Sequence, residues 1–224
     1  MTLIYLAFLL PSAAWAGSDG GGPTPARARY QVMAAAWAAA RGDAQGAAEA
    51  ARLARVHDPA GAMPRLIEAQ SLAGDPEEAG VRLQLLEEAT RDPGAAAAVF
   101  TALGQARVSA GHAEAAPAAF AAAEARGAGS ANYDAWLRAL DRLGRTSEIL
   151  PVYSRWASLR DPGPGGYALR AAWTPLRPED AARACDDASA AARLGEAIDE
   201  RLVVARCTAV GRDAEAAAAL ASRP

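Results

Sequence analysis

Glycines followed by a polar residue recur along this chain at nearly regular intervals. They are Gly42, Gly74, Gly111, Gly144 and Gly211, separated by 32, 37, 33 and 67 residues, the last interval being two periods. A glycine in a helix interior costs about 1 kcal/mol relative to alanine, so regularly spaced glycines mark helix ends. Periods of this length are typical of helical repeats. The pattern therefore predicts repeats of two antiparallel helices joined by a tight turn.

The composition also favours helices. Hydrophobic residues make up 52% of the 224-residue chain, alanine dominates them, and only 6% of all residues are aromatic. Alanine has the highest helix propensity, so we expect an all-α fold. The net charge of −3 argues against nucleic-acid binding, which requires a basic face. Every basic residue is arginine, so the chain has no lysine for Schiff-base or P-loop chemistry.

The N-terminus resembles an export signal. Leu3 to Leu10 form an apolar run, and Ala14-Trp15-Ala16 is a small-residue cleavage pattern, although no basic residue precedes the run. We expect a signal peptide over 1–16 and a flexible linker over 17–27; the alternative is a buried N-terminal helix. The run is shorter than the ~20 residues of a membrane span. A periplasmic or secreted protein, with no transmembrane span after cleavage, is therefore predicted.

Residues 97–130 carry the clearest repeat, with Leu103 and Gly104 on the first expected helix, Gly111 at the turn, and small or aromatic residues on the second: Ala116, Phe120 and Ala123. This segment resembles the tetratricopeptide repeat. Further copies are expected over 28–61, 60–93, 130–162, a degenerate 163–196, and 197–224, which together form a repeat domain over 28–224. The resemblance implies a right-handed α-solenoid of about five to six helix-turn-helix repeats with a concave face.

In the family that this chain resembles, first-helix residues line the concave face and bind a protein or peptide. The corresponding polar residues here are Gln105, Asp134, Arg138, Asp141 and Arg142. The alternative is a solvated helix face with charge pairs four residues apart. Family members that clamp two carboxylates use groove lysines and asparagines. This chain has no lysine, so we do not expect that subfamily.

No residue pattern points to catalysis, a metal site or a cofactor. His57 and His112 fall in different repeats, without further ligands at metal-binding spacing. Adjacent acidic residues such as Asp186-Asp187 point about 100° apart on a helix, so their carboxylates do not face each other as a catalytic pair would. We therefore expect them to be solvated surface charges. The predicted function is a non-catalytic scaffold in a bacterial envelope. The alternatives are an accessory subunit that uses its convex face and an envelope hydrolase with an unrecognised site.

The two cysteines are equidistant from an expected turn at Gly195-Glu196. In an antiparallel hairpin folded at this turn, the sulfurs of Cys185 and Cys207 would lie at the same height. We predict a disulfide, which an exported protein could form. The alternative is a pair of buried free thiols.

Overall fold

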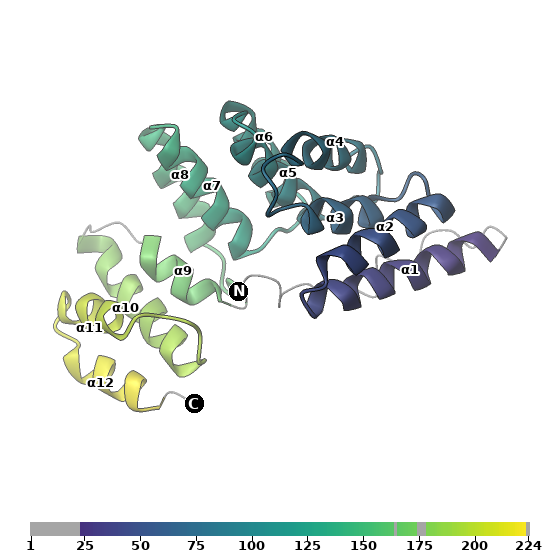
Figure 1. Ribbon diagram of the computed structural model, residues 1–224. Coiled ribbons are helices and arrows are strands. Elements are labelled where there is room, and N and C mark those ends of the chain that lie inside the picture. Colours follow the sequence, from purple (N-terminus) through teal and green to yellow (C-terminus); the bar gives the residue numbers. More distant parts are fainter. Residues whose placement is uncertain (1–22, 164, 174–177, 223–224) are drawn as a thin grey trace. The chain divides into compact units, whose positions relative to one another are not determined.

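The computed structural model describes residues 23–163, 165–173 and 178–222, which form helices joined by turns and loops, with no strand (Figure 1). The helices are α1 (Pro23–Ala40), α2 (Ala44–His57), α3 (Ala62–Ser71), α4 (Ala79–Ala89), α5 (Ala97–Ser109), the 3₁₀ helix η3 (Ala113–Ala115), α6 (Ala116–Glu124), α7 (Ser130–Arg142), α8 (Thr146–Ala157), α9 (Gly166–Trp173), α10 (Pro178–Arg193), α11 (Glu200–Thr208) and α12 (Asp213–Ala221). The all-α prediction is confirmed.

The chain divides into two compact units, at Gly127. The N-terminal unit contains α1 to α6, and the C-terminal unit contains α7 to α12. Within each unit every helix contacts the next one along the chain. Helices two apart also contact, namely α1 with α3, α3 with α5, α7 with α9, and α10 with α12. Each unit is thus a chain of helical hairpins packed on their neighbours.

The start of α1 differs from the sequence-based boundaries. The predicted signal peptide and most of the predicted linker lie outside the described residues, but the helix begins at Pro23, within the linker that was expected to reach residue 27. Proline is accepted in the first turn of a helix because the N–H groups there have no intrahelical partner. The last five residues of the predicted linker are therefore helical.

The glycine period corresponds to a repeated helix cap. Gly42, Gly111, Gly144 and Gly211 each lie between the helices of a hairpin and have φ of 65° to 80°, a region open to glycine. The N–H of the following residue donates to the carbonyl five residues earlier, over 2.8–3.0 Å, as in a Schellman motif. The polar residue after each glycine therefore lies in a cap. Gly74, within the longer segment between α3 and α4, does not have a positive φ.

Alanines allow the helices of the N-terminal unit to pack closely. Val32, Ala35 and Ala39 of α1 join Ala51 of α2 and Ile67 of α3 in one buried cluster. Small side chains at a helix contact shorten the distance between the axes. The alanine-rich sequence is therefore a packing surface as well as a helix former.

Gly104 on α5 packs directly against the ring of Phe120 on α6. Phe120 is fully buried, and a Cβ added at Gly104 would lie 2.5 Å from its Cε1 atom. No Cβ fits at that distance, so the hydrogen of glycine is what lets the ring pack there.

We expect Gly104→Leu to lower the free energy of unfolding by about 1–3 kcal/mol through overpacking against Phe120. Leucine's better helix propensity, worth about 0.8 kcal/mol, offsets only part of this cost. Thermal unfolding followed by circular dichroism measures the change. Gln105→Leu adds the same side chain at the exposed neighbouring position, and His112→Ala alters an exposed turn, so both should leave the transition nearly unchanged. An unaltered transition in Gly104→Leu would contradict this packing.

Trp156 of α8 is the centre of the core in the first half of the C-terminal unit. It is fully buried, its ring stacks on Tyr133 of α7 at a centroid distance of 5.8 Å, and the Tyr153 ring meets it edge-on at 6.5 Å. The indole Nε1 donates to Ser130 Oγ over 3.0 Å, and Ser130 Oγ in turn donates to the backbone carbonyl of Pro162. This network joins α7, α8 and the segment before α9.

A covalent bond and a buried ion pair hold the second half of the C-terminal unit. Cys185 of α10 and Cys207 of α11 form a disulfide with their Cα atoms 4.6 Å apart, as predicted. Arg170 of α9 donates from Nε and Nη2 to the two carboxylate oxygens of Asp187 on α10, over 2.8 and 2.6 Å. The expectation that Asp187 is a solvated surface charge is wrong, because only 3% of the residue is exposed.

Candidate functional site

The predicted α7 residues lie on the solvent side of an amphipathic helix. Tyr133, Trp136 and Leu140 are buried on the opposite side. Of the predicted residues, Asp134 is half-buried, whereas Arg138, Asp141 and Arg142 are exposed. Four of the five predicted binding residues therefore share one helix and face away from the core.

Asp134 and Arg138 form an ordered pair that includes a tryptophan. Arg138 Nε donates to Asp134 Oδ2 over 2.9 Å, one turn along the helix. Trp173 Nε1, from the end of α9, donates to Asp134 Oδ1 over 2.8 Å, and the Arg138 guanidinium lies 5.9 Å from the Trp173 ring centroid. The hydrogen bond and the charge of Asp134 raise the pKa of Arg138 above its ordinary value. Asp134 thus fixes one cation and one aromatic ring beside each other.

Trp173 is a member of this group that the sequence pattern did not reveal. It lies 39 residues from Asp134, at the end of the first helix of the degenerate repeat. The contact between α7 and α9 brings the two residues together. The sequence signal for this contact was that α7 and α9 are the first helices of successive expected repeats, which pack side by side.

Gln105, the fifth predicted residue, belongs to α5 of the N-terminal unit. It is exposed, and its backbone carbonyl accepts a hydrogen bond from Ser109 Oγ over 3.0 Å. It is not a member of the Asp134–Arg138–Trp173 group. The prediction that it binds the same partner stays a prediction.

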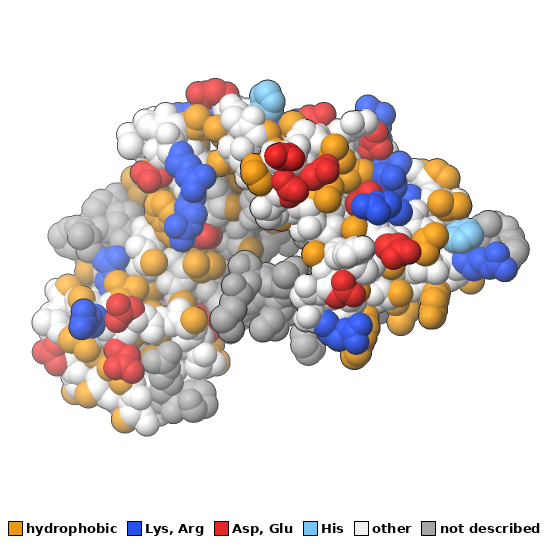
Figure 2. All heavy atoms as spheres, viewed as in Figure 1, with side chains coloured by type: hydrophobic (Ala, Val, Ile, Leu, Met, Phe, Trp, Pro, Cys, Tyr) orange, Lys and Arg blue, Asp and Glu red, His pale blue; other side chains and the backbone are white. Residues whose placement is uncertain are grey.

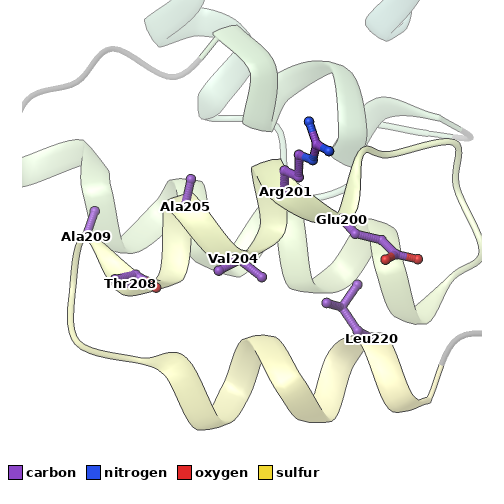
Figure 3. A pocket seen from close by; sticks show the side chains of 7 residues that line it. All are labelled: Glu200, Arg201, Val204, Ala205, Thr208, Ala209 and Leu220. Carbon is purple, nitrogen blue, oxygen red and sulfur yellow. The ribbon is translucent and has the colours of Figure 1, made fainter.

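An open hollow of about 680 Å³ lies along α11, next to α12. It is lined by Glu200, Arg201, Val204, Ala205, Thr208, Ala209 and Leu220. Val204 and Leu220 point into the space between the two helices, whereas Arg201 points away from α12 (Figure 3). Apart from the two charged residues at one end, this surface is made of small and aliphatic side chains, so it suits an apolar side chain or helix face.

The described residues contain no cluster of three or more His, Cys, Asp and Glu side chains that could hold a metal ion. His57 is the last residue of α2, where a basic group interacts well with the helix dipole, and His112 is an exposed residue before η3. Of the helices described, none is both long and apolar enough to cross a membrane.

No protein-family model matches this chain, and no curated protein matches it at a significant level.

Proposed function

We propose that this chain is a non-catalytic, protein-binding scaffold of helical repeats that resemble the tetratricopeptide repeat. Three properties support the proposal: the glycine period, the Schellman caps that recur with it, and the contacts of α1 with α3, of α3 with α5 and of α7 with α9. In this proposal the hairpins stack on one another, because a helix pair cannot bury its apolar face alone. They form the right-handed solenoid that the resemblance implies.

The observation that carries the proposed binding site is the Asp134–Arg138–Trp173 group. The Arg138 side chain is 60% exposed, yet it is oriented by Asp134 and lies beside an aromatic ring. A guanidinium held in place loses less entropy on binding a carboxylate, and arginine and tryptophan are enriched among residues that dominate binding energy. The site suits a peptide or protein surface that presents a carboxylate next to an apolar side chain.

The proposed compartment is the periplasm of a bacterium or the outside of its cell. The buried disulfide supports this, because disulfides form and persist in oxidising environments. The signal-like N-terminal sequence points to the same compartment. The partner is accordingly expected among envelope proteins.

Pull-down from a periplasmic fraction tests the proposed site. We expect the wild-type chain to retain a stoichiometric protein partner, and Arg138→Glu/Arg142→Glu to bind it at least about tenfold more weakly because two cations become anions. Arg193→Glu reverses one charge of the same kind at an exposed position of α10 and should bind normally. Turnover of an envelope substrate by the purified chain would refute the non-enzymatic assignment.

A second candidate is an accessory subunit that docks through α11 and α12 rather than through α7. The open apolar hollow along α11 favours it. Val204→Arg in the same pull-down separates the two candidates, since Val204 lines the hollow and is 46% exposed. Loss of the partner in Val204→Arg with retention in the α7 variant would support docking at the hollow.

A further inference from the structure

Helix α1 is apolar on two opposite sides. One side carries Val32, Ala35 and Ala39 into the buried cluster shared with α2 and α3. The other side carries Tyr30, Met33 and Trp37, which are 70%, 60% and 66% exposed. In Figure 2, hydrophobic side chains project from the outer side of α1. A helix that is apolar all round is normally covered on both sides, so the outer side is expected to contact a further surface.

The charges on α1 are all of one sign. Residues 23–41 contain Arg27, Arg29 and Arg41 and no acidic residue. At 100° per residue, Arg27 and Arg29 lie about 70–90° to either side of the stripe formed by Tyr30, Met33 and Trp37. Both arginines are exposed, and the Arg41 guanidinium lies 5.6 Å from the Trp37 ring centroid. The apolar stripe therefore has an arginine on each side and a third arginine, Arg41, at its C-terminal end.

This arrangement matches the chemistry of an anionic lipid surface. Helices that lie in the interface of a bilayer insert aromatic and aliphatic side chains, while flanking arginines contact phosphate groups. Tyrosine and tryptophan are the residues that favour the level of the lipid headgroups. We propose that the outer face of α1, defined by Tyr30, Met33 and Trp37 with Arg27, Arg29 and Arg41, binds the surface of a membrane that contains anionic lipids.

The charge of the remaining chain favours a single orientation on such a surface. The whole chain carries −3 and residues 23–41 carry +3, so all other residues together carry −6. An anionic bilayer attracts α1 and repels the rest of the molecule, with each arginine near the surface contributing about 1 kcal/mol.

A second copy of the chain fits this face less well. Two copies of residues 23–41 packed on each other would bring six arginines together without an acidic residue in either copy. Protein interfaces also set their register with charges of both signs. A lipid surface needs no register, so a face with one sign of charge suits it.

Co-sedimentation of the full chain with lipid vesicles tests the proposal. Vesicles of phosphatidylglycerol and phosphatidylcholine in equal parts should bind the chain at least about tenfold more strongly than pure phosphatidylcholine vesicles, and added salt should weaken this binding. Tyr30→Ala/Trp37→Ala and Arg27→Gln/Arg29→Gln should each reduce the affinity at least about tenfold. Wild type and variants share residues 1–22, so the differences report on α1.

Single-residue controls come from exposed residues of the C-terminal unit. Leu194→Ala removes an exposed apolar side chain, and Arg193→Gln removes an exposed cation; both should bind vesicles as the wild type does. Circular dichroism verifies that each variant is folded. Two outcomes overturn the proposal: the wild-type chain does not bind anionic vesicles, or the wild type and the α1 variants bind these vesicles with the same affinity. A protein partner lost only in the α1 variants, without vesicle binding, would also overturn it and assign this face to protein. None of these outcomes depends on the pull-down result for the α7 variant.

Discussion

Replacement of Arg170 by alanine is expected to destabilise the C-terminal unit by about 3–5 kcal/mol, because it leaves the carboxylate of Asp187 buried without its counter-ion. Arg170 and Asp187 are 5% and 3% exposed, and two hydrogen bonds join their side chains. Arg170 Nη1 also donates to the carbonyl of Leu159 over 2.9 Å. The guanidinium thus links the segment after α8 with α9 and α10, and its loss affects all three.

Urea unfolding followed by tryptophan fluorescence measures this effect. Three of the five tryptophans, Trp136, Trp156 and Trp173, lie in the C-terminal unit, so the signal reports chiefly on that unit. The double variant Arg170→Met/Asp187→Leu removes both charges and should recover most of the lost stability, because an apolar pair of similar volume can replace a buried ion pair. An Arg170→Ala variant as stable as the wild type would show that the pair is not buried in solution.

Loss of the disulfide is expected to lower the free energy of unfolding by about 3 kcal/mol in the chain-entropy description, since the bond closes a loop between residues 22 apart. Cys185 and Cys207 are both fully buried. Cys185→Ala/Cys207→Ala is the appropriate variant, because serine would place new hydroxyl groups in this apolar cluster. Ser189 Oγ lies 3.5 Å from Cys207 Sγ, and its hydroxyl is the donor, since a disulfide sulfur has no hydrogen.

Two measurements check the disulfide. The intact mass should rise by two hydrogens only after reduction, and alkylation of the unreduced, native chain would contradict the bond. The urea midpoint of the wild type should fall when a reductant is added, to a value near that of the double alanine variant. The reductant should leave the variant's own midpoint unchanged, which serves as the control.

The helices were predictable because their signals are local. Each Schellman cap needs one glycine and a nearby backbone donor, so a period of single residues was enough to locate hairpins such as α1–α2 and α7–α8. The disulfide was predictable for a related reason, because two residues equidistant from one turn are brought together by that turn alone. The start of α1 was not predictable, because the Gly- and Pro-rich stretch around it resembles a linker.

The site was only partly predictable, because its decisive contacts join different hairpins. Asp134 and Arg138 are one helical turn apart, so their pairing follows from helix periodicity. Trp173 and Arg170 acquire their partners only when α9 packs on α7 and on α10. The prediction that Asp187 is solvated is wrong, although adjacent acidic residues on a helix are usually solvated. Asp187 is buried because Arg170 of α9 lies beside it as a counter-ion, and the sequence does not show this contact.

The disulfide also determines what a protease cut in the segment between α10 and α11 would do. This segment contains Leu194 and Gly195, both exposed, so its backbone is open to cleavage. Cys185 and Cys207 lie on either side of it. A chain cut there would remain one covalent molecule, with α11 and α12 still attached to the rest of the C-terminal unit. Such a nick would therefore not release the C-terminal helices.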